Sequence, residues 1–223
     1  MPPLIIAIDG PSGAGKGTVA RAVAAALGYK HVDSGAMYRA VGWRCLQDGI
    51  ALDDEDAVAG VAARFPIAFD AETITIDGVD VTRAIRTPAI DRAAASVARL
   101  PRVREILVDR QRRFGEGGGI VMEGRDIGTV VFPHADVKLY LDASEEERAR
   151  RRASDPAHTG GPAAVSDVKT LLHERDRLDT TRKTSPLYAA SDAIVVDTTG
   201  KSVDEVVLAV LGLVDSVLRG SNF

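Results

Sequence analysis

Short, nearly continuous apolar runs recur along the chain at residues 4–9, 29–32, 120–123, 137–141 and 193–197. Apolar residues that do not alternate with polar ones are typical of strands buried on both faces of a parallel sheet. Parallel strands need crossover connections, which are usually helices. The pattern therefore predicts an α/β fold built around a parallel sheet.

Between these runs, apolar positions follow helical spacing in three segments, 17–27, 101–114 and 202–218. In the first of them, the shared face consists of Val19, Val23, Ala26 and Leu27. The last begins with Ser202 as a candidate N-cap, and Glu205 follows three residues later, which is the spacing of a capping box. Strands and helices therefore alternate along the chain, as in sheets built from strand–helix–strand units.

Residues 67–82 break this rhythm, because apolar and polar positions alternate there around Asp77 and Gly78. An Asp-Gly pair between alternating runs is a strong signal of a β-hairpin. It predicts a small antiparallel insertion outside the main sheet. A second irregular stretch, 154–167, is rich in Gly, Pro and Ser between two helical patterns, which predicts a mobile flap rather than a domain linker.

The first apolar run leads directly into the glycine-rich stretch GPSGAGKGT, residues 10–18. This spacing matches a phosphate-binding loop, in which backbone N–H groups and the start of the next helix face phosphate oxygens. We expect Lys16 to reach the outer phosphates and the hydroxyl of Thr18 to lie near a Mg²⁺ ion. The residues predicted to bind the nucleotide are Gly10, Pro11, Ser12, Gly13, Ala14, Gly15, Lys16, Gly17 and Thr18.

A residue type that is almost absent from the chain argues against a GTPase. The chain's single asparagine is Asn222, so the Asn-Lys-x-Asp motif that reads guanine is absent. A small kinase is the simplest remaining function, with AMP, UMP or a phosphate-free metabolite such as shikimate among the possible acceptors. The alternative from another class is a regulatory module, which would bind ATP without acceptor-dependent release of ADP.

A kinase whose acceptor carries a phosphate needs a second set of arginines, since guanidinium groups bind phosphate in a bidentate manner. Of the 28 Lys and Arg residues, 22 are Arg. The segments 33–40 and 122–133 carry polar residues just after predicted strands, at the sheet edge where ligands bind in open α/β sheets. In 173–182, Arg175, Asp179 and Arg182 have the spacing of one helix face. The alternative interpretation of that face is a solvated set of salt bridges.

Taken in order, the segments GPSGAGKGT, DSGAMYR, PRVRE, GRDIGTVVFP and ERDRLD with a later arginine resemble the bacterial cytidylate kinases, which are P-loop nucleoside monophosphate kinases. The resemblance spans nearly the whole chain. It implies transfer of the γ-phosphoryl group of ATP, with Mg²⁺, to CMP or dCMP. It also implies a monomer made of one domain, 1–223, with a five-stranded parallel core flanked by helices, a monophosphate-binding insertion at 62–95 and a lid at 148–168.

The resemblance further implies how this chain would hold the acceptor. Arg39, Arg125 and Arg182 would bind its phosphate, and Arg175 and Asp179 would face its sugar. The substrate-binding set also includes Ser34, Tyr38, Ser96, Arg104 and Asp126.

Cytosine would be read by Arg104 and Asp126. The exocyclic amino group of cytosine is a donor, which suits a carboxylate, and an arginine can serve its acceptors. One position departs from the family: Ala95 stands where a base-contacting serine is usual, with Ser96 next to it. Either a small helical shift brings Ser96 to the base, or that hydrogen bond is missing. Glu123 also replaces what is often an aspartate.

In the predicted lid, the resemblance places Arg148, Arg151 and Arg152 over the transferring phosphate. The residues implied in the transfer step are Lys16, Arg125, Arg182, Arg148 and Arg151. Phosphoryl transfer depends mainly on positioning and charge neutralisation, which arginines and a lysine supply. A lid that closes would also exclude water from the reacting group.

Composition and charge argue against several other classes of protein. A net charge of −4, and basic stretches without interleaved aromatics, argue against nucleic-acid binding. No apolar run reaches the roughly 18–20 residues of a membrane span, and we expect no secretory signal. Cys45 is the only cysteine, which excludes an intramolecular disulfide, so a cytoplasmic location is expected. Trp43 and Cys45 are assigned to the core, and the four histidines lack the spacing of metal ligands.

Overall fold

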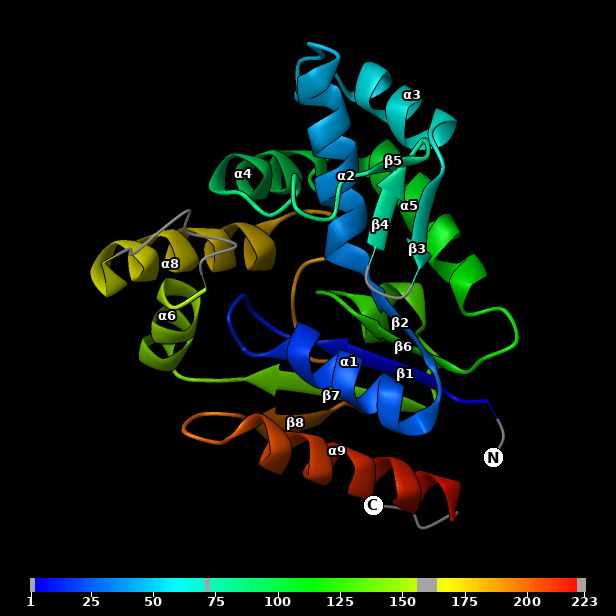
Figure 1. Cartoon of the computed structure of the whole chain (residues 1–223), viewed down its shortest axis with the longest axis vertical. Coiled ribbons are helices and arrows are strands. Elements are labelled where there is room, and N and C mark those ends of the chain that lie inside the picture. Colours follow the sequence, from blue (N-terminus) through cyan, green and yellow to red (C-terminus); the bar gives the residue numbers. More distant parts are fainter. Residues whose placement is uncertain (1–2, 71–72, 156–163, 220–223) are drawn as a thin grey trace.

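The computed structural model describes residues 3–70, 73–155 and 164–219 (Figure 1). A five-stranded sheet in the order β2–β6–β1–β7–β8 lies at its centre, and every neighbouring pair is parallel. The strands are β1 (Ile5–Asp9), β2 (Lys30–Asp33), β6 (Ile120–Glu123), β7 (Val137–Asp142) and β8 (Ile194–Asp197). Each of the five apolar runs forms one strand, which confirms the α/β fold with a parallel sheet.

Helices cover the sheet on both faces. On one face lie α1 (Lys16–Leu27) and α9 (Val203–Leu218), whose valines share a buried cluster with β1 and β7. On the other face lie α5 (Pro101–Phe114) and η1 (Ile127–Val131), a single π-helical turn. The capping box at Ser202 and Glu205 is present. The predicted face of α1 is wrong at one position, because Ala26 is exposed while Ala20 and Ala24 are buried.

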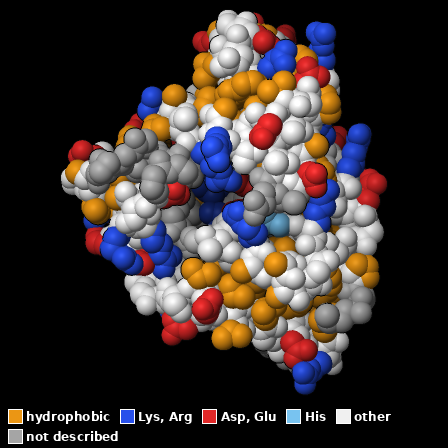
Figure 2. Space-filling view, in the orientation of Figure 1, with side chains coloured by type: hydrophobic (Ala, Val, Ile, Leu, Met, Phe, Trp, Pro, Cys, Tyr) orange, Lys and Arg blue, Asp and Glu red, His pale blue; other side chains and the backbone are white. Residues whose placement is uncertain are grey.

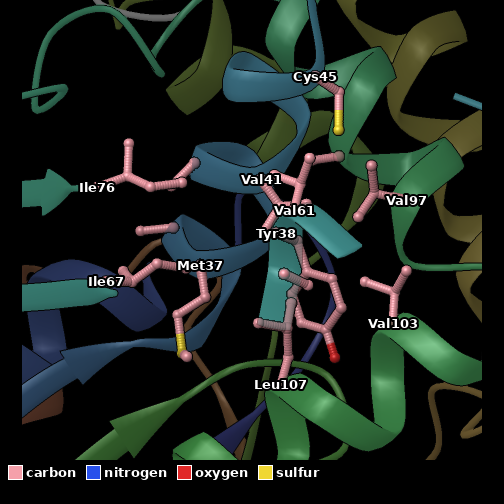
Figure 3. Packing of buried hydrophobic residues seen from close by; sticks show 14 of the residues in the cluster. Met37, Tyr38, Val41, Cys45, Val61, Ile67, Ile76, Val97, Val103 and Leu107 are labelled. Atoms are coloured by element: carbon pink, nitrogen blue, oxygen red, sulfur yellow. The ribbon is translucent and has the colours of Figure 1, made fainter. Parts of the chain in front are cut away.

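A second hydrophobic core stands above the sheet in Figure 1. It is built from α2 (Ser34–Gln47), α3 (Glu55–Arg64), α4 (Pro88–Val97) and α5, around a three-stranded antiparallel sheet of β3 (Ile67–Asp70), β4 (Thr73–Ile76) and β5 (Val79–Asp80). Met37, Tyr38 and Leu107 are among its buried side chains (Figure 3). Trp43 packs against this cluster and Cys45 is buried inside it, as assigned.

The hairpin prediction is confirmed and extended. Asp77 and Gly78 have φ values of 54° and 74°, the left-handed pair that a two-residue turn between β4 and β5 requires. Strand β3 pairs with the other edge of β4, so the insertion has three strands rather than two. The hydrophobic cluster around it reaches from Ala36 to Leu107. It therefore extends beyond the insertion boundaries of 62–95 on both sides.

Two further helices, α6 (Glu145–Ala153) and α8 (Val165–Thr181), pack on each other beside the carboxyl ends of the strands (Figure 1). The predicted lid, 148–168, and flap, 154–167, fall partly outside the described residues, since 156–163 are not among them. The described remainder of the lid belongs to the end of α6 and the start of α8. Within the described ranges, no helix is both long and apolar enough to cross a membrane.

Candidate active site

The glycine-rich loop joins β1 to α1 and lines a cavity of about 520 Å³. Gly13 and Gly15 have φ values of 83° and 88°, the left-handed region that lets the backbone curl between strand and helix. Gly10 approaches the neighbouring strand so closely that an added Cβ would lie 2.0 Å from the carbonyl oxygen of Leu141. The sequence therefore needs glycine at these positions for steric reasons, and the resulting loop presents residues 12–18 to the cavity.

Lys16 is the first residue of α1, and its side chain is almost fully buried. Its ammonium group donates a hydrogen bond to the Pro11 carbonyl at 2.7 Å, which closes the loop on itself. Burial, with a smaller contribution from the nearby Arg125 guanidinium, lowers the pKa of Lys16 to about 7. An anionic ligand in the loop would favour the charged form again, because opposite charge offsets the loss of hydration.

The other side of the same cavity is lined by arginines and carboxylates from several helices, from strand ends and from the segments that join them. Figure 2 shows Lys and Arg side chains gathered where the surface is hollowed between the two cores. The predicted site residues that line it are Ser12, Gly13, Ala14, Gly15, Lys16, Gly17, Thr18, Ser34, Tyr38, Arg39, Arg104, Arg125, Asp126, Arg151, Arg152, Arg175, Asp179 and Arg182. Segments distant in the sequence thus converge on one pocket.

A buried ion pair between Arg104 and Asp126 lies on the arginine side of the cavity. Arg104 comes from α5 and also lies 5.4 Å from the ring centre of Tyr38. The Nη2 atom of Arg182 lies 3.8 Å from Asp126 and has no hydrogen-bond partner among the described residues. Because a buried donor without a partner is unfavourable, a ligand oxygen at that atom would be stabilising.

Asp179 holds three arginines together. Its Oδ2 accepts a hydrogen bond from Arg125 Nε at 2.9 Å and lies 3.4 Å from Arg175 Nε, while Oδ1 lies 3.9 Å from Arg182. Burial alone would raise the pKa of Asp179, but the adjacent arginines, Arg125 foremost, lower it below its usual value. Asp179 therefore stays ionised and keeps the guanidinium groups of a helix and a strand end in one cluster.

The segment after β2 contributes Ser34, Tyr38 and Arg39, all on the first turns of α2. Ser34 donates a hydrogen bond to the Glu123 carbonyl at 2.7 Å, which ties the ends of β2 and β6 together. Burial raises the pKa of the Tyr38 hydroxyl to about 12, so this side chain is neutral. Arg39 is bonded to Asp91 of α4 through Nε at 2.9 Å.

The arginines of α6 are positioned by carbonyls and carboxylates around the loop. Arg148 donates from Nη1 to the Ser12 carbonyl at 3.1 Å and to Asp176 at 2.5 Å. Arg151 donates to the hydroxyl and carbonyl of Thr198 at 2.9 and 2.6 Å. Arg148 therefore contacts the phosphate-binding loop directly, and Arg151 contacts it through Thr198, whose hydroxyl donates to the Ala14 carbonyl at 3.2 Å.

A family model described as cytidylate kinase matches residues 6–216 of this chain. The chain belongs to the cytidylate kinase family. It is 47% identical over 213 residues to a cytidylate kinase of Desulfitobacterium hafniense (strain Y51), covering 94% of this chain and 92% of the relative. It is 48% identical over 202 residues to a cytidylate kinase of Caldanaerobacter subterraneus subsp. tengcongensis, covering 91% and 90%. The resemblance read from the five motifs is confirmed.

Solved structures agree with the fold. A gluconokinase from Sinorhizobium meliloti 1021 superposes with a TM-score of 0.50 at 17% identity and covers 99% of both chains. A protein described as uncharacterized, from Eubacterium ventriosum ATCC 27560, superposes with a TM-score of 0.55 at 10% identity, covering 96% of this chain and 99% of that one. At these identities the likeness concerns the architecture alone.

Ala95, which the resemblance marks as a departure from the family, lies on α4 next to Ser96. Ser96 is exposed, and its hydroxyl donates to the Arg92 carbonyl at 3.4 Å on its own helix. Ala94 and Ala98 line the cavity, whereas Ser96 does not. The structure therefore does not bring Ser96 to the other predicted site residues, and no helical shift compensates for Ala95.

Asp9, at the end of β1, does not line the cavity but supports it from below the surface, and the sequence interpretation missed it. Its carboxylate accepts the N–H groups of Ile127 and Gly128 at 2.8 and 2.7 Å, immediately after Arg125 and Asp126. Burial raises its pKa to about 6. The sequence offered one signal for it, an acidic residue at the end of a buried strand just before the loop. Its hydrogen-bond partners could not be predicted, because residues 127 and 128 are distant in the sequence.

Proposed function

We propose that this member of the cytidylate kinase family transfers the γ-phosphoryl group of ATP to CMP or dCMP. The observation that supports this function is a single cavity with a phosphate-binding loop at one end and an arginine–carboxylate cluster at the other. A pocket of this kind can hold two phosphate-bearing ligands end to end. It favours an acceptor that carries a phosphate over a neutral metabolite such as shikimate.

On the donor side, Lys16 and the N–H groups of the loop hold the ATP phosphates. Arg148 and Arg151 approach the loop from α6, where their charge offsets the charge of the group in transfer. Their partners Ser12 and Thr198 fix both guanidinium groups before substrate arrives. Such preorganisation lowers the cost of arranging donors during the reaction.

On the acceptor side, Arg39, Arg125 and Arg182 bind the phosphate of CMP. The Nη2 atom of Arg182, which lacks a hydrogen-bond partner among the described residues, supplies one donor. Arg175 and Asp179 face the sugar, beside Ser34 and Tyr38, which line the cavity next to Arg39.

The base would lie against Arg104 and Asp126. The cytosine amino group donates to the Asp126 carboxylate, and Arg104 donates to the ring acceptors. Because Arg104 and Asp126 are already paired, each offers its remaining donors or lone pairs to the base in a fixed geometry. Uracil has a carbonyl in place of the amino group, so this pair favours cytosine.

The residues around the loop fit a Mg²⁺ ion. Thr18 offers a hydroxyl on the first turn of α1, and Glu123 Oε1 lies 2.8 Å from where a Cβ on Gly17 would be. Among the described residues, no group of three or more His, Cys, Asp or Glu could hold a metal. Mg²⁺ commonly takes one or two protein oxygens and completes its shell with phosphate and water. When bound, it would neutralise charge on the ATP phosphates.

The function is tested by ADP formation from ATP and Mg²⁺ with AMP, GMP, CMP, UMP, dCMP and shikimate as acceptors. We expect a response confined to CMP and dCMP. A response led by UMP would show that the missing serine contact at Ala95 relaxes base selection. Silence with every acceptor would refute the kinase function and favour a regulatory ATP-binding module.

The arginine roles are tested by Arg125→Ala and Arg182→Ala. We expect each to lower kcat/KM for CMP by at least about tenfold, since a charged hydrogen bond contributes about 1.5–3 kcal/mol. Arg150→Ala is the matched control, because Arg150 is an exposed arginine of α6 paired only with Glu147 in the ion pairs described. Wild-type kcat/KM in both cavity variants would contradict the assignment.

The finer predictions of a monomer and of a cytoplasmic location remain part of this proposal. The prediction of a monomer rests on the resemblance of the five sequence motifs to those of the bacterial cytidylate kinases. Light scattering after gel filtration, at working concentrations and with CMP present, would measure the mass. A dimer mass under those conditions would contradict the prediction.

A further inference from the structure

Asp91 on the first turn of α4 contacts three arginines that line the cavity, although it does not line the cavity itself. Its Oδ1 accepts from Arg39 Nε at 2.9 Å, and its Oδ2 accepts from Arg152. Its backbone carbonyl accepts from Arg175 Nη1 at 3.1 Å. These partners come from α2, α6 and α8, so one residue of α4 joins the elements that surround the acceptor side.

The contacts continue from Asp91 to the phosphate-binding loop. Arg152, which pairs with Asp91, is one helical turn from Arg148 on α6. Arg148 in turn donates to the Ser12 carbonyl within the loop at 3.1 Å. A continuous series of polar contacts and one rigid helix therefore connects the donor end of the cavity with Arg39 at the acceptor end.

The Asp91 pairs are shielded from water more than ordinary surface pairs. The side chains of Asp91, Arg39 and Arg152 are 16%, 17% and 19% exposed. Interactions between charges strengthen when water is partly excluded, whereas exposed pairs contribute little. Burial alone would lower the pKa of Arg39, but Asp33 and Asp91 raise it. Arg39 is therefore held charged and oriented by two carboxylates.

We propose that Asp91 is a positioning residue that couples occupancy of the phosphate-binding loop to binding of the acceptor. A nucleotide in the loop fixes α6 through Arg148, and Arg152 then fixes Asp91 and the guanidinium group of Arg39. Ordering Arg39 in advance reduces the conformational cost of binding the acceptor's phosphate. The inference rests on the proposed function, which places Arg39 at that phosphate.

Such coupling is measured by the dissociation constant of CMP with and without a non-hydrolysable ATP analogue and Mg²⁺, by calorimetry. In the wild type we expect the analogue to tighten CMP binding by at least about fivefold, the lower range of coupling between sites. Asp91→Asn keeps the shape of the side chain and removes its charge. We expect the analogue to tighten CMP binding less than about twofold in that variant.

Asp48→Asn is the matched control, because Asp48 accepts from Arg44 Nε at 2.7 Å on the exposed side of α2 and does not line the cavity. It should keep the wild-type coupling. Equal tightening in Asp91→Asn and the wild type would overturn the proposal. So would a weaker CMP affinity by the same factor with and without the analogue, which is the result of a purely structural defect.

A double-mutant cycle that combines Asp91→Asn with Arg152→Gln tests whether the coupling depends on the Asp91–Arg152 ion pair. If Asp91 acts through Arg152, the two substitutions together lose no more coupling than either alone. Additive losses would contradict that route. Failure of the proposed function is distinguishable, since the wild type would then form no CDP, whereas failure of this inference leaves CDP formation intact.

Discussion

At the scale of single residues, the site depends on charges held where water is scarce. Lys16 and Asp9 are both buried, and burial favours the neutral form of each side chain. It lowers the pKa of Lys16 to about 7 and raises the pKa of Asp9 to about 6. The Asp9 carboxylate accepts hydrogen bonds from two backbone N–H groups at the start of η1. The carboxylate thus orients the segment that carries Arg125 and Asp126.

Asp9→Asn should change both stability and acceptor binding. The folded protein binds the Asp9 proton with a pKa of about 6, against 3.8 for an ordinary Asp, so between these values the native state holds more protons than the unfolded state. The stability of the wild type relative to Asp9→Asn therefore rises as pH falls from 7 to 4, by about 2–3 kcal/mol at most. Urea denaturation at several pH values measures it.

The same variant should raise the KM for CMP at pH 7.5, since an amide presents only one acceptor oxygen for two N–H groups. Asp136→Asn is the control: Asp136 also accepts a backbone N–H, from Ile5 at 2.7 Å, but at the opposite end of β1. An unchanged KM in Asp9→Asn, or an equal increase in the control, would show that Asp9 does not position the acceptor site.

At the scale of elements, the strand–loop–helix unit of β1 and α1 depends on glycine for two different reasons. Gly13 and Gly15 supply left-handed backbone angles, while Gly10 also allows β7 to approach. Gly212 has neither purpose. Gly212 in the middle of α9 has open space where a Cβ would lie.

Gly10→Ala and Gly212→Ala should therefore have opposite effects on the free energy of unfolding. Gly10→Ala places a Cβ 2.0 Å from the Leu141 carbonyl oxygen at a φ of +145°, and should destabilise by at least about 2 kcal/mol. Gly212→Ala should stabilise by about 0.5–1 kcal/mol, because alanine loses less backbone entropy. Urea titrations of both variants test the pair. Two changes of the same sign would contradict the steric explanation.

At the scale of the whole molecule, two hydrophobic cores meet at one cavity. The lower core covers the parallel sheet, and the upper core reaches from Ala36 to Leu107 around the antiparallel sheet (Figure 1). The carboxyl ends of β1, β2 and β6 open between them, which is where ligands bind in open α/β sheets. The cavity is therefore lined by residues from both sides.

A ligand that spans the cavity should therefore stabilise more than either half alone. We expect adenosine and cytidine joined by a phosphate chain to raise Tm more than ATP or CMP at equal concentration, because one ligand then makes both sets of contacts. The matching compound with two adenosines should give a smaller increase. Equal shifts from the two linked compounds would show that the acceptor end does not select cytosine.

Local patterns in the sequence were sufficient for the strands, the capping box at Ser202, the Asp-Gly turn and the phosphate-binding loop. Each depends on the conformational preferences of neighbouring residues and on which face is buried. The motifs that resemble cytidylate kinases also identified the segments that converge on the cavity. All of this information lies within short stretches of chain.

Only the tertiary structure decided which residues meet. The contacts of Asp9 with Ile127 and of Asp91 with Arg39 and Arg152 join positions far apart in the chain, and neither has a local signature. The exposure of Ala26 and of Ser96 followed from how α1 and α4 pack, which periodicity within one helix does not determine. The sequence does not determine which charged side chains will pair. Folding decides this, because it brings two groups together and removes the water between them.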